Sequence, residues 1–589
     1  MSDTDDNNKL SRRAFNKRLA LGGAALAGAA FVDSVAQAPQ PQRPVASASA
    51  ARRRPNMLLI LSDQERGWDD LPAGLGLSAH DWLRERGTSF ANHNVHTTPC
   101  SPSRSTIYTG QHTALNGMTS NIGAPPFPKL AEVPTLGHML RDQGYYTAYK
   151  GKWHLSDVPT SPSVRYGPFR SARDALEPFG FSDYSDVGIA DGATWSGFKF
   201  DGEVASAASQ WLHEKGRALD QPWLLAVNFV NPHDIVFYDD VDRMQSLTRL
   251  DRDFLAPLAP PPKEGPYTQD WDLPLPKSWH ADDLSTKPWA QRSYVDFCAE
   301  LYGKIDRHDE ARWRRYQSYY YNCIRDVDAH ALTVLRTLEQ LGLDDNTVIV
   351  YTADHGDMLG AHGLRQKGPT MYKENVRVPL IVRHPEYRGG ITTQALSGPI
   401  DLLPTLLSFA GLGDVQRAAQ YPALKGVDLT PALADASART KRDKAGVLYA
   451  YNTMLYVDPE AASKIIKSGE DATWTSLFKA NLAEGRLHPR LDHPGLFRGV
   501  HDGRYKFARY FRPDRHHIPK DWATLLAHNE LELYDTHSDP DEIVNLAVEP
   551  EARRELILAL NAKTNQLIED EIGFDDGREH PGPTFLYRL

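Results

Sequence analysis

Two short apolar runs, residues 57–62 and 347–352, each lead into an acidic residue that is followed by a second residue able to bind a metal ion. The pairs are Asp63 with Gln64 and Asp354 with His355. Continuous apolar runs of this length are typical of strands buried on both faces of a parallel sheet. If the two strands are neighbours, the four polar side chains converge where the strands end. Carboxylate and amide oxygens suit Ca²⁺ or Mg²⁺, and the imidazole extends the choice to Mn²⁺ or Zn²⁺.

Segment 98–104 reads TPCSPSR and places a cysteine at the start of a predicted helix. The helix covers residues 101–108, because a proline is tolerated in the first turn and Gly110 ends the pattern. The amide groups and the dipole of a helix N-terminus favour an anion beside Cys100. Arg104, one turn further on, can face the same position. The alternative is a capped helix that carries an incidental thiol.

Basic side chains follow other predicted elements of the same sheet. Lys152 and His154 come after a short strand, and residues two apart in an extended segment project to one side. His233 follows the buried strand at 223–230, and Lys367 lies in a Gly-rich loop after the second metal-binding pair. Taken one at a time, such residues usually have surface or capping roles. Their shared position after strands places them at one edge of the sheet.

Beyond residue 55, strand-like and helix-like segments alternate, which predicts an α/β fold with a large, mainly parallel sheet sandwiched by helices. The predicted strands are 57–62, 146–150, 223–230, 347–352 and 378–383, and the predicted helices are 79–86, 101–108, 136–143, 204–215, 316–341 and 401–410. Residues 235–315 are rich in Pro and charge and are typical of an inserted loop region.

The pattern changes after about residue 415. Short strands at 447–451, 497–501, 505–511 and 531–534 and a closing helix at 551–572 are separated by turns. They predict a smaller C-terminal α+β subdomain with an antiparallel sheet. We therefore expect a main domain at 55–414 and this subdomain at 415–589.

The start of the chain has the pattern of an export signal. Arg12 and Arg13 precede a mild apolar run at 19–32, and the triplet AQA supplies a cleavage site. The pattern is typical of a twin-arginine signal peptide at 1–38, followed by a disordered linker at 39–54. The apolar run is too short for a permanent membrane span. We expect a periplasmic or secreted protein carried by the twin-arginine export machinery.

The 589 residues include 66 Lys plus Arg and 76 Asp plus Glu, which gives a net charge of 66 − 76 = −10. With 41% apolar and 24% charged residues, the composition excludes a collagen, a disordered chain and a multi-span membrane protein. The acidic balance argues against a nucleic-acid partner. Three cysteines exclude a disulfide framework. Cys298 and Cys323 either pair after export or stay as buried thiols, and Cys100 has no nearby Cys for a redox role.

Several segments together form one pattern in chain order. They are C-x-P-S-R at 100–104 with Thr109-Gly110, G-K-W-H at 151–154, Pro55-Asn56 with Asp63, DHGDMLGAHG at 354–363 with Lys367, RVPLI from Arg377, IDLLPTLLSFAG at 400–411, and ELYD…DP-E-NLA from Glu532 to Ala547. In this combination and order they resemble the type I, formylglycine-dependent sulfatases of the alkaline-phosphatase-like superfamily. The resemblance covers essentially the whole mature chain and implies a catalytic domain at 55–414.

The resemblance implies that a formylglycine-generating maturation enzyme oxidises Cys100 to Cα-formylglycine. The hydrate of this aldehyde would attack the sulfur of a sulfate ester, the alcohol would leave, and collapse of the hydrate would expel inorganic sulfate. A divalent metal, with calcium favoured over Mn, Mg or Zn, would be held by Asp63, Gln64, Asp354 and His355 together with residue 100. The substrate would be a small-molecule or carbohydrate sulfate ester.

The resemblance also implies roles for the basic residues. Arg104 and Lys152 would hold the hydrate and the sulfate. His154 would be the base for the collapse step. His233 and Lys367 would bind sulfate oxygens and protonate the leaving oxygen.

Two ligand positions depart from the pattern of many family members, which have a second Asp after the first and an Asn after the later one. Gln64 and His355 stand there, as in phosphonate monoester hydrolases and some choline sulfatases of the superfamily. This leaves the metal open and makes a phosphonate monoester or phosphodiester hydrolase the alternative, although Lys152-Trp153-His154 is sulfatase-like. A non-catalytic carbohydrate-binding protein would have lost the cysteine or a ligand, and none is lost. The predicted pocket loops are 155–200, 235–315 and 452–495, and their sequences contain no motif that identifies the substrate alcohol.

Overall fold

In the computed structural model, the described residues are 54–122, 124, 128–158, 175–185, 194–240, 258–461, 463, 492–575 and 577. The predicted signal peptide at 1–38 and the linker up to residue 53 lie outside them, so both stay predictions. The same holds for parts of the three predicted pocket loops. No helix among the described residues is long and apolar enough to cross a membrane.

Eight strands form one sheet in the order β4-β3-β5-β1-β6-β7-β2-β8. Their bounds, in that order, are Ser182–Ser185, Tyr146–Gly151, Trp223–Pro232, Asn56–Asp63, Thr347–Ala353, Leu380–Arg383, Thr88–His93 and Ile391–Ser397. In this sheet β7 runs antiparallel to both of its neighbours, β6 and β2, and the other neighbouring pairs are parallel. The predicted α/β fold with a large, mainly parallel sheet is therefore confirmed.

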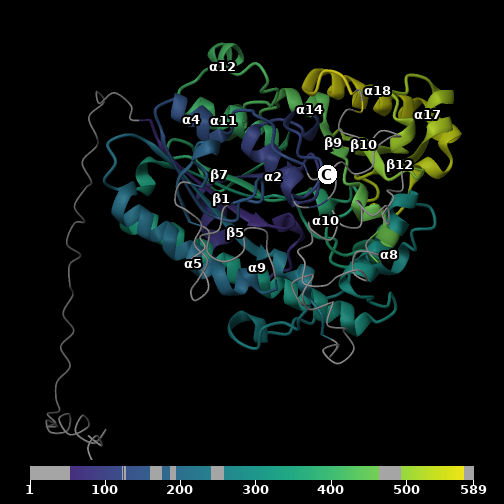
Figure 1. The fold of residues 1–589 in the computed structure, drawn as a ribbon, viewed down its shortest axis with the longest axis horizontal. Helices are drawn as coiled ribbons and strands as arrows, with labels where there is room; N and C mark the ends of the chain where they lie inside the picture. The colour runs from purple at the N-terminus through teal and green to yellow at the C-terminus, as the bar shows by residue number, and fades with distance from the viewer. Residues whose placement is uncertain are drawn as a thin grey trace, which may run out of the picture. The chain divides into compact units, whose positions relative to one another are not determined.

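Helices cover both faces of this sheet (Figure 1). One face packs against α1 (Ser78–Arg86), α5 (Ser196–Trp211) and α9 (Glu310–Gln340). The other face packs against α2 (Cys100–Thr109), α4 (Leu136–Asp142) and α11 (Leu402–Phe409). The helices bury the apolar faces of the sheet and leave its strand ends to carry polar groups.

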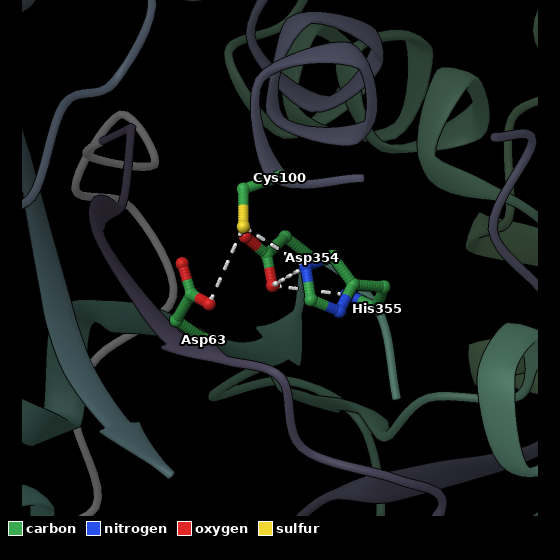
Figure 2. A group of neighbouring side chains, drawn as sticks. All are labelled: Asp63, Cys100, Asp354 and His355. Atoms are coloured by element: carbon green, nitrogen blue, oxygen red, sulfur yellow. Dashed lines mark hydrogen bonds and ion pairs between the residues drawn. The ribbon is translucent and has the colours of Figure 1, made fainter. Parts of the chain in front are cut away.

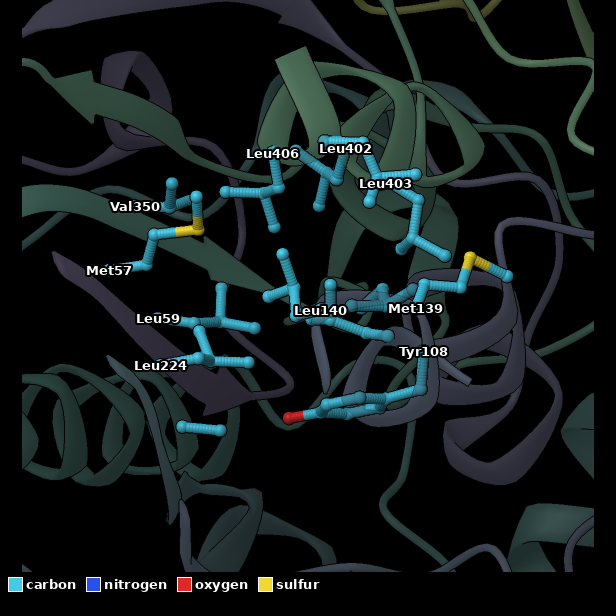
Figure 3. Packing of buried hydrophobic residues seen from close by; sticks show 14 of the residues in the cluster. Met57, Leu59, Tyr108, Met139, Leu140, Leu224, Val350, Leu402, Leu403 and Leu406 are labelled. Carbon is cyan, nitrogen blue, oxygen red and sulfur yellow. The ribbon is translucent and has the colours of Figure 1, made fainter. Parts of the chain in front are cut away.

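The side chains of β1 show how the two layers use one strand. Met57, Leu59 and Leu61 pack into the cluster with α2, α4 and α11, part of which Figure 3 shows. Leu58 and Ile60 point the other way, into the cluster with α1, α5 and α9. All five side chains are at most 1% exposed. Because both faces are covered, the strand has no polar side, which explains its unbroken apolar run.

A second sheet of four antiparallel strands has the order β12-β11-β10-β9. The bounds are Val447–Tyr451 for β9, Leu496–His501 for β10, Tyr505–Phe511 for β11 and Asn529–Asp535 for β12. Helix α18 (Arg554–Glu571) packs on this sheet through a separate apolar cluster. The predicted antiparallel sheet and closing helix are confirmed, and the domain boundary at residue 415 stays a prediction.

Some elements differ from the prediction. The strands β2, β4 and β8 were not predicted, because half-exposed side chains interrupt their apolar pattern. Helix α8 (Trp289–Tyr302) lies inside the segment 235–315, so the prediction of a loop region is wrong there. Cys298 in α8 and Cys323 in α9 are both buried free thiols, so the structure agrees with the unpaired alternative.

Helix α5 begins at Ser196 rather than at residue 204. The carboxylate of Asp234, just after β5, accepts hydrogen bonds from the amides of Gly197 at 3.0 Å and Phe198 at 2.9 Å. These contacts satisfy first-turn amides that have no partner within the helix. The helix start therefore depends on a distant carboxylate that local sequence does not reveal.

Gly151 ends β3 in the left-handed region, with φ 87°. A Cβ atom at this position would overlap the carbonyl oxygen of Asn228 in the neighbouring strand β5. Glycine is therefore needed both for its backbone angle and for the close approach of two strands. This position directly precedes Lys152.

We expect Gly151→Ala to destabilise the protein and to displace Lys152. Gly411→Ala is the matched control, because Gly411 has φ 91° and open space where a Cβ would lie. The control should lose about 1–2 kcal/mol of unfolding free energy, the cost of a left-handed backbone, and Gly151→Ala should lose clearly more. Urea unfolding of both variants measures this, and equal losses would contradict the argument.

Candidate active site

The candidate site lies at the carboxyl edge of the large sheet. β1 pairs with β6 in register from Asn56 with Thr347 to Ser62 with Ala353. The residues that follow this pairing are Asp63 and Asp354. β5 and β3 lie on the other side of β1 and lead to His233 and Lys152. The strands of the two metal-binding pairs are therefore neighbours, which is the condition on which their predicted convergence depends, and β5 and β3 follow on the other side of β1.

Four side chains form the centre of the site, as Figure 2 shows: Asp63, Cys100, Asp354 and His355. Sγ of Cys100 lies 3.8 Å from Oδ1 of Asp63 and 3.1 Å from Nε2 of His355. Their potential ligand atoms lie within 4.8 Å of one another, and all four residues are buried. Three separate segments of the chain meet here.

The four side chains fit a divalent cation. Oδ2 of Asp354 is buried and accepts no hydrogen bond from a described residue. Burial and the nearby charge of Asp63 raise the pKa of Asp354 to about 7, because two close carboxylates are costly to ionise together. Burial lowers the pKa of His355, which favours the neutral imidazole that binds metals. A divalent cation would balance the two carboxylates and accept the imidazole nitrogen.

Gln64 belongs to the same centre. Its Nε2 donates to Oδ2 of Asp357 at 2.6 Å, and its Oε1 accepts a hydrogen bond from Nζ of Lys367. Its backbone is left-handed, with φ 74°, and its backbone N–H donates to Oδ1 of Asp354 at 3.0 Å. The side chain is therefore fixed, and the amide oxygen keeps a second lone pair for an ion.

Cys100 is the first residue of α2, as the sequence pattern suggested to within one residue. The hydroxyl of Ser101 donates to the carbonyl oxygen of His154 at 2.7 Å, and the hydroxyl of Ser103 donates to the carbonyl oxygen of Asp354. These bonds tie the helix start to the ends of two strands. Burial raises the pKa of the Cys100 thiol, so the unmodified residue is a thiol and not a reactive thiolate.

Arg104 is fully buried one turn into α2. Its guanidinium donates to the carbonyl oxygen of Trp153 at 3.1 Å and to Oδ1 of Asn228 at 2.7 Å. It also donates to the carbonyl oxygen of Lys152, and its Nη1 lies 3.5 Å from Oδ2 of Asp354. Arg104 therefore holds the turn after β3 and adds positive charge beside the carboxylates.

Lys152 and two histidines complete the predicted set. Nζ of Lys152 lies 2.8 Å from Oδ2 of Asp63. Burial alone would raise the pKa of Asp63, but Lys152 and the other basic groups of the site outweigh it and hold that pKa well below its usual value. Burial, with a further contribution from Lys152, lowers the pKa of His154 and of His233, so both imidazoles are neutral.

The local geometry of His154 differs from the prediction. The argument from an extended segment does not apply to it, because His154 has a left-handed backbone with φ 58°. Its carbonyl oxygen accepts the hydrogen bond from Ser101, which fixes the turn instead. The structure nevertheless places its imidazole close enough to Lys152 and Asp63 for both charges to act on its pKa.

Sequence reasoning did not single out Glu65, which follows Gln64 and centres a buried network. The side chains that donate hydrogen bonds to its carboxylate, at 2.5–2.7 Å, are Ser62, Trp68, His80 and Tyr351. Nδ1 of His80 also lies 2.5 Å from Oδ1 of Asp328, so one imidazole bridges two carboxylates. Burial lowers the pKa of His80, but the two carboxylates outweigh it and raise that pKa to about 9.

This network supports the strand end that carries Asp63 and Gln64. Its members come from β1 and the segment that follows it, which includes Trp68 in the short helix η1 (Trp68–Asp70), and from α1, α9 and β6. No motif in the sequence joins them. Asn228, which holds Arg104, was missed for the same reason. Asp357, which holds Gln64, was also missed, although it stands in the DHGD motif at 354–357 and could have been identified there.

The family model described as Sulfatase matches residues 55–412, more than half of the chain. The chain belongs to the sulfatase family. It is therefore a sulfuric ester hydrolase. The N-acetylglucosamine-6-O-sulfatase of Bacteroides thetaiotaomicron is 28% identical over 64% of this chain and 72% of its own length.

Solved structures agree with this family at the level of fold. A 2-O GAG sulfatase has a TM-score of 0.61 and 21% identity, covering 89% of this chain and 94% of its own. The phosphonate monoester hydrolase of Agrobacterium radiobacter has a TM-score of 0.58 and 20% identity, covering 88% and 96%. The sulfatase fold of this chain is thus shared with an enzyme whose name gives a different ester.

The bridging His80 predicts a pH dependence of stability. Its pKa is about 9 in the folded protein against a usual value of 6.5, so its charged form stabilises the fold fully below pH 6.5. That contribution, up to about 3 kcal/mol, is lost as the pH rises through 9. We expect His80→Gln to be less stable than the parent at pH 6 and to show a flatter profile above it.

Urea unfolding at a series of pH values measures this difference. His213→Gln is the control, because His213 is exposed in η4 (Leu212–Gly216), the π-helical segment that continues α5. In the control, the free energy of unfolding should change with pH as it does in the parent protein. If the parent and His80→Gln show the same change with pH, the assignment of a charged, bridging His80 is contradicted.

Proposed function

We propose that this sulfatase hydrolyses its sulfate ester through Cα-formylglycine formed from Cys100. The position of Cys100 carries the proposal. Its Sγ lies at the start of α2, 3.1 Å from His355 and 3.8 Å from Asp63. Cationic and neutral basic groups surround it, and burial disfavours a plain thiolate at this place. A modified residue 100 is therefore a better nucleophile than the thiol.

The metal would be a divalent ion held by Asp63, Gln64, Asp354 and His355 with residue 100. Calcium is the ion we favour, because oxygen donors dominate the set, and Mn, Mg and Zn are the alternatives. When both are present, the formylglycine hydrate supplies the nucleophile and the ion supplies positive charge beside it.

The basic side chains would divide the remaining work. Arg104 and Lys152 would hold the negative charge that develops on residue 100 and on the sulfate. Neutral His154 would take up the proton released when sulfate is expelled. His233, whose Nδ1 is buried with no hydrogen bond to a described residue, and Lys367 would bind sulfate oxygens and protonate the leaving oxygen.

The substrate class and the route of the protein belong to the same proposal. A carbohydrate or small-molecule sulfate ester is supported by a relative that is named for a sulfated sugar. The paired Arg12 and Arg13 support export by the twin-arginine machinery to the periplasm or medium. Because that machinery carries folded proteins, the maturation enzyme would act on Cys100 before export.

A phosphonate monoester hydrolase is the second candidate function. Gln64 and His355 in the metal centre favour it, and so does the similarity in fold to a phosphonate monoester hydrolase. Parallel assays on an aryl sulfate and on the matching aryl phosphonate monoester separate the two functions. We expect the higher kcat/KM on the sulfate, and the reverse order would favour the second candidate.

The tryptic peptide Gly87–Arg104 tests the modification directly. Protein isolated from its native host should give this peptide with an aldehyde in place of the CH₂–SH group of Cys100. We expect Cys100→Ala to lower turnover by at least about 1,000-fold, because the nucleophile is gone, and to leave folding intact. Cys323→Ala, at a buried thiol of α9, is the matched control and should keep its turnover.

Two results would reject this proposal. One is a peptide that contains only cysteine in active protein. The other is turnover by Cys100→Ala at the level of the control variant.

We expect Asp354→Asn to lose metal and activity together. Removal of an outer partner of a metal ligand already weakens binding about 10–100-fold, and loss of a ligand charge should cost at least as much. Asp345→Asn, at an exposed position before β6, is the control. Metal content by mass spectrometry and the sulfate-ester assay measure the two effects, and unchanged metal content in Asp354→Asn would contradict the assigned ligand.

A further inference from the structure

A second group of potential metal ligands shares no residue with the active site. His96, His112 and Glu571 each offer one ligand atom, and these atoms lie within 4.8 Å of one another. All three residues are buried. They come from the loop before Cys100, from the start of α3 (Thr113–Asn116) and from the last residue of α18. We propose that these three side chains bind a zinc ion.

His96 is oriented as a metal ligand. Its Nδ1 lies 2.7 Å from the carbonyl oxygen of Leu448 in β9, and a carbonyl oxygen only accepts, so Nδ1 carries the proton. Nε2 therefore presents a lone pair. This atom is buried and has no hydrogen bond to a described residue. Histidines that bind metals usually donate their other N–H to a carbonyl or carboxylate in this way.

His112 and Glu571 lie beside that lone pair. The ring centroids of His96 and His112 are 4.7 Å apart, and Nε2 of His112 lies 2.6 Å from Oε2 of Glu571. Oε1 of Glu571 accepts a hydrogen bond from Arg442, which donates to Oδ1 of Asp401 at 2.6 Å. The carboxylate is thus held so that its other oxygen faces the two imidazoles.

In this group the buried acids outnumber the buried guanidinium by one, so a further cation would balance the charge. Glu571 and Asp401 are two buried acids, and Arg442 is the buried guanidinium that pairs with both. A proton shared by His112 and Glu571 would supply the missing charge but would leave the lone pair of His96 unused. A zinc ion uses all three ligand atoms, and the displaced proton passes to solvent.

The donor set selects the metal. Two imidazole nitrogens and one carboxylate oxygen suit Zn²⁺, with a water as fourth ligand, whereas Ca²⁺ needs six to eight oxygen ligands. The active site has mainly oxygen donors and would select a different ion. Zinc at the second site would tie the C-terminal helix α18 to the loop that leads into Cys100.

Zinc titration of the full-length chain tests the proposal, with Asp354→Asn as the background because it weakens the active-site metal centre. We expect the metal-free Asp354→Asn protein to bind zinc, and the added His96→Asn substitution to lower the stoichiometry by one per chain. Asn keeps a donor for the carbonyl of Leu448 and removes Nε2. His93→Asn is the matched control, because His93 is also buried, with Nδ1 2.9 Å from Oγ of Ser397, but lies outside the cluster.

Two outcomes decide the matter. Lower zinc binding in the His96→Asn chain than in the His93→Asn chain supports the site, and equal binding overturns it. If His96→Asn does not fold, cobalt titration of the Asp354→Asn chain decides instead. A visible absorption band of four-coordinate Co²⁺ that zinc abolishes supports the site, and its absence overturns it.

Discussion

Two buried carboxylates, Asp63 and Asp354, lie side by side at the end of two paired strands. Many of the surrounding groups offset the electrostatic cost of placing these two acids together. The register of β1 with β6 brings them together. Burial makes their joint ionisation costly, which is why the pKa of Asp354 rises to about 7 while cations hold that of Asp63 low. A divalent ion would balance the two charges, and the pair would in turn favour the binding of such an ion.

The groups around the carboxylates are held by specific hydrogen bonds to backbone carbonyls and to other side chains. Arg104 is fixed by the carbonyl oxygens of the turn after β3, and Gln64 is fixed by Asp357 and Lys367. Behind them, Glu65 and His80 form a second layer of charge in which every donor meets an acceptor. Such preorganised polar groups are what stabilises charge in a reaction that takes place away from water.

The C-terminal part of the chain takes part in this arrangement. His96 lies four residues before Cys100, and its imidazole donates a hydrogen bond to the carbonyl oxygen of Leu448 in β9. Helix α18 ends at Glu571, which lies beside His112. The segment that carries Cys100 is therefore supported by the antiparallel sheet and its helix as well as by the large sheet. This makes the position of Cys100 a property of the whole fold.

The sequence by itself determined the strands with unbroken apolar runs, because a strand covered on both faces leaves no polar position, as Leu58 and Leu59 show. It also determined which residues stand at strand ends, since the motifs around Asp63, Cys100 and Asp354 are local. Only the tertiary structure decided the strands β2 and β8, whose partly exposed side chains interrupt the apolar pattern. The partners of Glu65 and His96 were likewise beyond the sequence, because hydrogen bonds between residues far apart in the chain depend on how the sheets and helices pack.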